Sequence, residues 1–370
     1  MINVLMISTD TKILEEGSSV RARMIEYGTL FKELHIVLFN TDTKAPVEVS
    51  LSNNVHVYPT QSFSKLVYIK DAIKIGKKVI KEKNLVVGES VITTQDPFET
   101  GMVGRMLSKN SGIALHVQIH TDFQSSYFKK SGLNKIRIAL SKIVLPHARA
   151  VRAVSERIVH TLPLDIQKRA AVLPIFTDIS IIKNSPVNID LKKKYPQFKK
   201  IILIASRLTK EKDVVTALEA FGQVVKKYPG TGLVIVGDGP LKPHLEEFVA
   251  KCEKSVKESV VFEFWMNHDA VISCMKTCDI FLSTSLYEGY GLSMLEAYVA
   301  GALVVATDAG IAPLIVHQKC LVEPGNKKGI VTSLSTALNG SLVNKPYVYP
   351  YSSKQNYLDE YKADIERTLI

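Results

Sequence analysis

The chain has 370 residues, of which 46% are hydrophobic and 22% charged, and a length of this kind predicts two domains. No apolar run approaches the roughly 18 residues of a membrane-spanning helix, which argues against an integral membrane protein. The formal charge of +11 lies mostly in residues 1–185, which hold 25 Lys and Arg against 16 Asp and Glu, and this excess favours anionic partners.

The first residues, MINVLMIST, are uncharged and contain no cleavage-like site, so they are typical of a buried strand and not of a signal peptide. Four cysteines occur in the second half, at spacings that fit neither a zinc site nor a CxxC redox motif: Cys252, Cys274, Cys278 and Cys320. Cys274 and Cys278 share a helical face, and we expect them to pack in a core. The cysteine usage predicts a reducing, cytoplasmic location.

Short apolar runs alternate with amphipathic helical patterns along the whole chain. Strands are expected at 2–8, 34–40, 90–94, 114–120 and 148–155 in one sheet, and at 200–206, 232–238, 260–265, 279–285 and 302–308 in another. Helices are expected at 64–83, 134–145, 213–228 and 241–254. Apolar strands separated by helices predict α/β units, and thus two doubly wound domains with parallel sheets and a cleft between them.

The domain boundary is expected in the segment 178–198, which is rich in Pro, Asn and Lys. We therefore predict a first domain over 1–185 and a second over 186–351. The last residues, 352–370, have a helical pattern, and we expect this helix to pack back onto the first domain.

Two cations follow the strand expected at 200–206. Arg207 and Lys212 lie in SRLTKEKD, and a helix is expected to begin near Asp213. Cations beside a helix N-terminus form a phosphate site, although a solvated basic turn is the alternative. The next strand ends in GDGP, where Gly239 serves either the turn itself or the close approach of a ligand.

Two glutamates stand eight positions apart in LYEGYGLSMLEA. Glu288 lies in a glycine-flanked turn, and Glu296 lies in the first turn of an expected helix. Ionised carboxylates accept hydrogen bonds from sugar hydroxyls, so the pair is a candidate clamp on a polyhydroxylated ligand. The alternative is a capping box between Ser293 and Glu296, which leaves Glu288 unexplained.

These three segments, in this order and spacing, resemble the retaining GT-B glycosyltransferases of family 4, and the resemblance extends over the whole chain. The two glutamates match the E-x7-E motif of that family, which is its most specific feature. The resemblance implies two Rossmann-like domains that face each other across a cleft. The first would bind the acceptor and the second the nucleotide-sugar donor.

The resemblance also implies roles for individual residues. Glu288 would contact the donor sugar, and Glu296 the ribose hydroxyls of the nucleotide. Arg207 and Lys212 would neutralise the diphosphate. The backbone of the glycine turn would support the diphosphate oxygens, through Gly289, Tyr290, Gly291 and Leu292.

The first half contains VQIHTDF, which places His120 just after a strand and Asp122 two residues later. A lone histidine is usually structural, but this one matches the family histidine that faces the donor sugar. The sequence also departs from the family. Only Gly17 stands where the family has a Gly-Gly loop beside the diphosphate, Leu314 replaces an acidic residue, and EFW at 263–265 replaces a glycine-containing pattern.

The implied reaction transfers a sugar from a UDP- or GDP-sugar to an acceptor hydroxyl with retention, in the synthesis of a surface polysaccharide or glycolipid. No Asp-x-Asp triplet and no metal cluster is found in the sequence, so we expect a reaction without a metal or another cofactor. We favour front-face attack, and double displacement stays open. The alternatives are a non-catalytic nucleotide-sugar-binding protein and a two-carboxylate glycoside hydrolase. A nicotinamide enzyme is disfavoured because the first strand lacks a GxGxxG motif.

Residues 64–84 carry seven lysines among apolar residues at helical spacing. A cationic amphipathic helix of this kind can lie on an anionic membrane, which would suit a lipid-linked acceptor and a peripheral location at its inner face. The alternative is a solvated lysine face over a packed core. Nucleic acid is not an expected partner, because no aromatic residues are interleaved with the basic ones.

Overall fold

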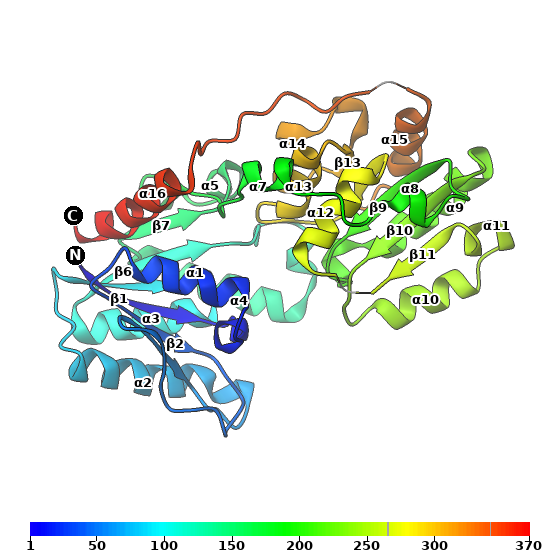
Figure 1. Cartoon of the computed structure of the whole chain (residues 1–370). Coiled ribbons are helices and arrows are strands. Elements are labelled where there is room, and N and C mark those ends of the chain that lie inside the picture. The colour runs from blue at the N-terminus through cyan, green and yellow to red at the C-terminus, as the bar shows by residue number, and fades with distance from the viewer. Residues whose placement is uncertain (265, 341) are drawn as a thin grey trace. The chain divides into compact units, whose positions relative to one another are not determined.

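The computed structural model describes residues 1–264, 266–340 and 342–370. The chain divides into two compact units, which Figure 1 shows with the course of the chain from blue to red. The first unit comprises Met1–Pro174 and Tyr351–Ile370, and the second comprises Ile175–Pro350.

The division lies earlier in the chain than the boundary predicted at 185. The helix α7 (Ile179–Asn184) packs against α13 (Leu292–Ala300) of the second unit. The Ser185 carbonyl accepts a hydrogen bond from Lys276 Nζ at 2.5 Å. These contacts attach the segment after Pro174 to the second unit, although its composition is that of a linker.

The first unit is built on an eight-stranded sheet with the order β3-β4-β2-β1-β5-β6-β7-β8. Its strands are β1 (Asn3–Ser8), β2 (Glu33–Leu38), β3 (Val49–Ser52), β4 (Val55–Pro59), β5 (Ser90–Thr94), β6 (Ala114–Ile119), β7 (Ala150–Ala153) and β8 (Ala170–Val172). Neighbouring strands are parallel except at the edge, where β3 runs antiparallel to β4. The expected parallel sheet is therefore mixed. Strands β3, β4 and β8 were not predicted from the sequence, because each is too short or too polar to form an apolar run.

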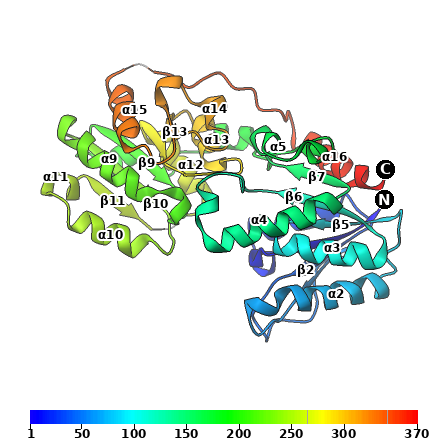
Figure 2. The same cartoon turned by 180° about the vertical axis from the view of Figure 1, so that it is seen from behind.

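Helices cover both faces of this sheet. They are α1 (Ser19–Gly28), α2 (Tyr68–Glu82), α3 (Glu99–Ser111), α4 (Gly132–Val144), α5 (Glu156–His160), α6 (Leu164–Gln167) and α16 (Lys354–Glu366), with short 3-10 turns at Thr11–Leu14, Lys65–Val67, Phe128–Lys130, Leu145–His147 and Arg367–Leu369. Figure 2 shows α2, α3 and α4 on one face, and Figure 1 shows α1 and α16 on the other. The C-terminal helix α16 contacts β5 and β7, so the last residues of the chain complete the first unit.

The second unit has a six-stranded parallel sheet with the order β11-β10-β9-β12-β13-β14. Its strands are β9 (Lys200–Ala205), β10 (Thr231–Val236), β11 (Val260–Glu263), β12 (Ile280–Ser283), β13 (Leu303–Thr307) and β14 (Leu321–Val322). The chain moves outward from β9 in one direction and then returns to start again at β12. Ligands of open α/β sheets bind at such a switch point, outside the carboxyl ends of the two central strands. The strand expected at 260–265 ends at Glu263, and Trp265 lies outside the described residues.

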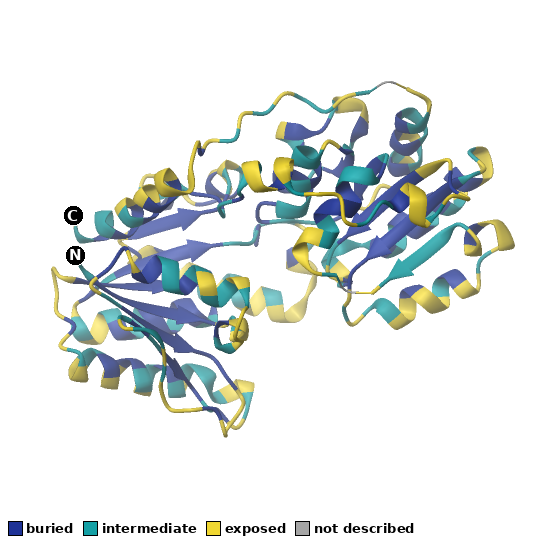
Figure 3. Cartoon of the chain, in the orientation of Figure 1, coloured by how far each residue is buried: buried dark blue, intermediate teal, exposed yellow. Residues whose placement is uncertain are grey.

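Helices also cover both faces of the second sheet, with α9 and α15 packed together on one face and α12 and α13 on the other. The remaining bounds are α8 (Leu191–Lys194), α9 (Val214–Lys227), α10 (Lys242–Ala250), α11 (Lys254–Lys257), α12 (His268–Thr277), α14 (Ala312–Ile315) and α15 (Lys327–Asn339), with 3-10 turns at Lys210–Lys212 and Gln318–Cys320. Figure 3 shows that the central strands of each sheet are buried and that the outer helix faces are exposed. Cys274 and Cys278 are buried, which confirms their predicted place in a core. In the described ranges no helix is both long and apolar enough to cross a membrane.

Candidate functional site

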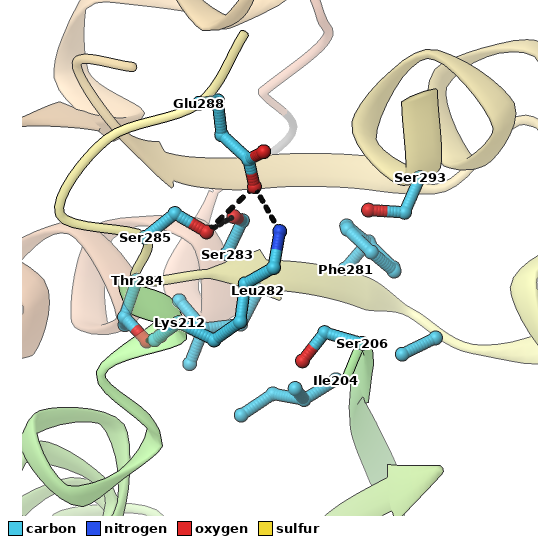
Figure 4. Close-up of a pocket in the computed structure, with 11 residues that line it drawn as sticks. Ile204, Ser206, Lys212, Phe281, Leu282, Ser283, Thr284, Ser285, Glu288 and Ser293 are labelled. Atoms are coloured by element: carbon cyan, nitrogen blue, oxygen red, sulfur yellow. Dashed lines mark hydrogen bonds and ion pairs between the residues drawn. The ribbon is translucent and has the colours of Figure 1, made fainter. Parts of the chain in front are cut away.

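A small pocket lies at the switch point of the second sheet (Figure 4). Its floor is formed by the last residues of β9 and β12 and by the residues that follow them. Lys212, Glu288 and Ser293 complete the lining. Two of the residues predicted from the sequence, Lys212 and Glu288, are therefore brought into one pocket, at the place where the topology predicts a ligand.

Lys212 and Glu288 form an ion pair inside this pocket. Lys212 Nζ lies 2.5 Å from Glu288 Oε1, and the two side chains are only 15% and 14% exposed. The same carboxylate oxygen accepts a hydrogen bond from Ser285 Oγ at 2.8 Å. Figure 4 shows both donors directed at Glu288. The carboxylate is thus held in one position by two donors from different segments.

The loop that carries Glu288 is anchored to the segment that carries Lys212. Thr284 Oγ1 donates to the Lys212 carbonyl at 2.9 Å, and Leu286 N donates to the Glu211 carbonyl at 2.8 Å. On its other side, Thr307 Oγ1 donates to the Ser285 carbonyl at 2.6 Å. These bonds explain why the ion pair forms between distant parts of the chain.

The glycine turn leads directly into α13. Gly291 is the N-cap residue, with φ of +90°, and Leu292 begins the helix. The first backbone N–H groups of a helix have no partners within the helix and carry partial positive charge, so they can bind an anion. Gly289, Tyr290 and Gly291 are buried. Tyr290 is held through its carbonyl, which accepts from Ile311 N at 2.7 Å.

The capping box between Ser293 and Glu296 does not form. The helix begins one residue before Ser293, and its cap is the backbone of Gly291, with no side-chain cap. Ser293 lines the pocket instead. The alternative explanation of Glu296 is therefore wrong, because helical geometry begins at Leu292.

Glu296 is paired with His268, the first residue of α12. His268 Nε2 lies 2.9 Å from Glu296 Oε1, where the imidazole is 59% exposed and the carboxylate 16%. The hydrogen bond to Glu296 raises the pKa of His268 above its ordinary value. Glu288 and Glu296 therefore have separate partners, and a ligand that binds Glu296 must compete with His268.

The structure does not bring Arg207 into the pocket. Its side chain is 78% exposed, and its Nη2 lies 3.6 Å from Glu211 Oε1. Gly239 packs closely against the Leu208 backbone. A Cβ atom at position 239 would lie 2.6 Å from the Leu208 carbonyl oxygen. Close packing of the backbone therefore accounts for Gly239 without a ligand.

In the first unit, His120 and Asp122 follow β6, and each has its own partner. His120 Nε2 lies 3.1 Å from Gln118 Oε1. Burial lowers the pKa of His120 to about 3, with further contributions from Arg152 and Arg23. Burial raises the pKa of Asp122, while Arg157, 3.7 Å away, opposes this shift. The imidazole is thus neutral at physiological pH.

Gly17 lies in the loop between the 3-10 turn at Thr11–Leu14 and α1, with φ of +76° and nothing within 4 Å of a Cβ position. The next residue, Ser18, caps α1 by accepting from Arg21 N at 3.1 Å. Gly17 therefore lies directly before a helix N-terminus.

Three residues near the predicted ones were missed: Ser285, His268 and Gln118. Ser285 could have been found as a polar residue just after a strand end, and His268 as a histidine at a helix start. Gln118 gives no signal, because it is a buried position inside an apolar strand. Within the described ranges, no group of three or more His, Cys, Asp and Glu is placed to hold a metal ion.

A family model matches most of the second unit. The family model described as "Glycosyl transferases group 1" matches residues 188–354. Alpha-monoglucosyldiacylglycerol synthase of Streptococcus pneumoniae is 29% identical over 230 residues, which are 58% of this chain and 51% of that protein. Poly(ribitol-phosphate) alpha-N-acetylglucosaminyltransferase of Staphylococcus aureus is 25% identical over 257 residues, 68% of this chain and 48% of that protein. The matches thus span about half the length of these two relatives.

Solved structures give the fold of the whole chain. Sucrose-phosphate synthase from Thermosynechococcus elongatus superposes with a TM-score of 0.74 at 16% identity, over 100% of this chain and 94% of that one. HepE from Anabaena, in complex with UDP and glucose, gives 0.68 at 18% identity, over 100% and 93%. The chain has the GT-B fold, and its residues 188–354 resemble the glycosyl transferases of group 1.

Proposed function

We propose that this protein transfers a sugar from a nucleotide diphosphate sugar to an acceptor hydroxyl, with retention of anomeric configuration. The observation that carries the proposal is the Lys212–Glu288 pair, which lies 2.5 Å apart at the switch point of a sheet in a group 1 domain. A cation and a carboxylate side by side match the two parts of such a donor. The diphosphate needs positive charge, and the sugar hydroxyls need an acceptor.

In this proposal Lys212 and the N-terminus of α13 bind the diphosphate. They stabilise the negative charge that develops as the bond to the sugar breaks. Glu288 accepts hydrogen bonds from the sugar, and Glu296 exchanges His268 for the ribose hydroxyls. Arg207, which is exposed, supplies a second cation from the turn after β9.

We further propose front-face attack, in which the departing phosphate assists deprotonation of the acceptor. Trapping of a covalent sugar on Glu288 or Asp122 would contradict it and favour double displacement. Inversion of the anomeric centre, read by NMR of the first product formed, would refute retention itself.

Metal independence is part of the proposal, because Lys212, Arg207 and helix α13 supply the positive charge that a divalent ion would otherwise give. Activity should be unchanged after treatment with EDTA. Loss of donor binding in EDTA that Mn²⁺ restores would refute this part and leave the transfer reaction standing.

The first experiment is a thermal-shift screen with UDP, GDP, ADP and their common sugar conjugates. A ligand at a hundred times its Kd stabilises a protein by about 2.7 kcal/mol, enough to raise the melting temperature visibly. We expect a shift with one nucleotide family that is weakened in the Glu288→Gln variant for sugar conjugates. Glu246→Gln, which alters an exposed glutamate on α10, should behave as wild type.

Other outcomes would favour the alternatives. Nucleotide-sugar binding without turnover for any acceptor would favour a non-catalytic binding protein. Cleavage of a simple glycoside without any nucleotide would favour a glycoside hydrolase. No shift with any nucleotide would refute the donor assignment.

We propose that the acceptor is a glycolipid or surface polysaccharide precursor, because the two relatives named above are an alpha-monoglucosyldiacylglycerol synthase and a poly(ribitol-phosphate) alpha-N-acetylglucosaminyltransferase. In this proposal a lipid-linked acceptor is bound at a surface of the first unit. Phe63 directly precedes the lysine-rich segment 64–84 and Leu66 lies within it, and they are 81% and 94% exposed. The inner face of α2 is different, since it packs on α3 and β2 and buries Ala72 and Val79. The membrane proposal therefore rests on Phe63 and Leu66 together with the lysines.

Sedimentation with anionic vesicles tests this surface. Wild-type protein should bind phosphatidylglycerol vesicles at low salt and bind less when Phe63 and Leu66 are both changed to Ala. Leu164→Ala, which removes another exposed leucine of the first unit, serves as the control. Absence of binding at low salt would refute peripheral association and would leave the donor site untouched.

A further inference from the structure

The first unit contains a buried polar network that ends at His120. Its centre is Arg152 on β7, which is only 2% exposed. Arg152 donates to the Leu173 carbonyl from Nε at 3.0 Å and to the Pro174 carbonyl from Nη2 at 3.2 Å. It also lies over the Tyr361 ring, 5.0 Å from its centroid. Carbonyl oxygens and an aromatic face thus compensate for the buried charge.

The remaining contacts of Arg152 reach α16 and β6. Nη2 donates to Tyr357 Oη at 3.0 Å, and Nη1 donates to Gln118 Oε1 at 3.1 Å. Gln118 is itself 5% exposed, and its Nε2 donates to Thr93 Oγ1 at 3.1 Å.

This arrangement fixes which end of the Gln118 amide faces Arg152. A guanidinium group has donors only and cannot lose its proton in a protein, so it requires an acceptor. The flipped amide would place two donors against each other in a buried site. The amide oxygen must therefore face Arg152, and the same oxygen lies 3.1 Å from His120 Nε2.

The protonation of His120 follows from this oxygen. An amide oxygen only accepts, so His120 Nε2 must carry a proton. Burial, together with the charge of Arg152, lowers the pKa of His120 to about 3, which keeps the ring neutral. A neutral imidazole with a proton on Nε2 has a lone pair on Nδ1. Among the described residues none forms a hydrogen bond with His120 Nδ1, so this atom is available to a ligand.

The C-terminal helix holds the far side of the same network. Thr93 Oγ1 lies 2.9 Å from His116 Nδ1, and His116 Nε2 lies 3.0 Å from Asp364 Oδ2 on α16. Arg367 Nη2 completes the pairing with Asp364 at 2.7 Å. The positions of Gln118 and Thr93 therefore depend on residues about 250 positions later in the chain.

We propose that Gln118, oriented by Arg152, is a positioning residue that fixes His120 as the Nε2–H tautomer and so makes Nδ1 a hydrogen-bond acceptor for a hydroxyl of the donor sugar. The second half of this proposal rests on the proposed function, and the first half does not. The consequence is that His120 accepts a hydroxyl hydrogen at Nδ1, while its Nε2–H donates only to Gln118 and the ring carries no charge.

The experiment is NMR of the full-length protein labelled with ¹⁵N-histidine. The signals of His120, one of nine histidines, are identified by their loss in His120→Asn. We expect a protonated Nε2 and an unprotonated Nδ1, with no titration of His120 between about pH 5 and 8. A protonated Nδ1 in the wild-type protein would overturn the proposal.

Three variants test the role of Gln118. Gln118→Met removes the acceptor and should release the tautomer, while lowering kcat/KM for the donor about tenfold. Gln118→Glu keeps an acceptor between Arg152 and His120 and should preserve the Nε2–H form. Tyr357→Phe removes another partner of Arg152 and should leave the His120 signals unchanged. A Nε2–H pattern that persists in Gln118→Met would overturn the proposal.

The two proposals can fail separately. The spectrum requires no substrate, so it also decides the tautomer if Gln118→Met does not fold, through the wild-type protein and Gln118→Glu. A tautomer that depends on Gln118 in a protein that binds no nucleotide sugar would refute the assignment of Nδ1 to the sugar. A protein that binds the donor but shows the other tautomer would refute the role of Gln118 alone.

Discussion

Lys212 Nζ and Glu288 Oε1 lie 2.5 Å apart, although 76 positions separate the two residues in the chain. Both side chains are largely buried, so each charge depends on the other for compensation. A diphosphate sugar would have to share this pair, because its phosphates need the ammonium group and its hydroxyls need the carboxylate. We therefore expect recognition of the nucleotide and recognition of the sugar to depend on the same ion pair.

Removal of the cation tests this coupling. Lys212→Met keeps most of the aliphatic stem and leaves Glu288 with Ser285 as its donor, so we expect lower stability against urea. Charge-assisted hydrogen bonds contribute about 1.5–3 kcal/mol, so the Kd for a nucleoside diphosphate should rise at least tenfold. Lys210→Met, an exposed lysine two positions away, is the control. Equal calorimetric affinity in both variants would contradict a diphosphate role for Lys212.

The His268–Glu296 pair predicts a pH dependence of stability. The pKa of His268 is raised in the folded protein by its bond to Glu296, so the contribution of the pair is fully present below the ordinary histidine pKa of about 6.5. It is lost as pH rises through the raised value. Urea titrations from pH 6 to 9 should show this loss in the wild-type protein and not in His268→Ala.

The same pair predicts that nucleotide affinity increases over this pH range. Charged His268 competes with the ribose for Glu296, and deprotonation removes the competitor. Calorimetry from pH 6 to 9 should show tighter binding at the alkaline end, and His268→Ala should flatten the profile. A profile that is identical in both proteins would exclude competition at Glu296.

The lowered pKa of His120 predicts that acid destabilises the folded protein. Its pKa of about 3 in the folded protein lies below the ordinary value of about 6.5, so the unfolded chain takes up a proton at this residue first. The free energy of unfolding should therefore fall as pH drops from about 6.5 towards 3. Other groups titrate in this range, so the quantity to measure is the difference between wild type and His120→Asn. The difference in free energy of unfolding between the two proteins should shrink as the pH falls. A difference that stays constant would show that folding does not lower the pKa of His120.

The backbone at Gly310 packs closely against the glycine turn. A Cβ atom at this position would lie 2.3 Å from the Tyr290 carbonyl oxygen and 2.9 Å from Glu288 Cβ. Gly310→Ala should thus displace the turn, destabilise the protein by more than about 1–2 kcal/mol and weaken donor binding. Gly301→Ala is a matched control, because Gly301 also has positive φ but nothing lies within 4 Å of its Cβ position. Equal effects of both changes on donor affinity would mean that only backbone strain matters.

Much of the fold can be predicted from local sequence patterns. Ten of the strands were predicted because apolar runs of five to eight residues are a property of neighbouring positions. The spacing of Glu288 and Glu296 and their place after a strand are local in the same way. The antiparallel β3 was missed, since its sequence VSLS is half-exposed and carries no such pattern.

Pairings between distant segments could not be predicted. The sequence shows Lys212 and Glu288 as separate residues, and it shows neither the choice of His268 as the partner of Glu296 nor the cap of α13 at Gly291. These depend on where the ends of β9, β11 and β12 lie in the folded sheet. The attachment of residues 175–185 to the second unit depends on contacts with α12 and α13 in the same way.

His120 shows most clearly which features are local in the sequence and which depend on the tertiary structure. The sequence by itself determined that a histidine follows the strand Ala114–Ile119, because strand length and the polar residues after it are local. Only the tertiary structure decided its proton, because the amide of Gln118 is oriented by Arg152 on β7, which is enclosed by Tyr357 and Tyr361 on α16. A buried hydrogen-bond donor requires an acceptor, and the fold decides which residue supplies it. The chemistry of the ring is therefore set by residues that the chain places far away in sequence and the fold places next to it.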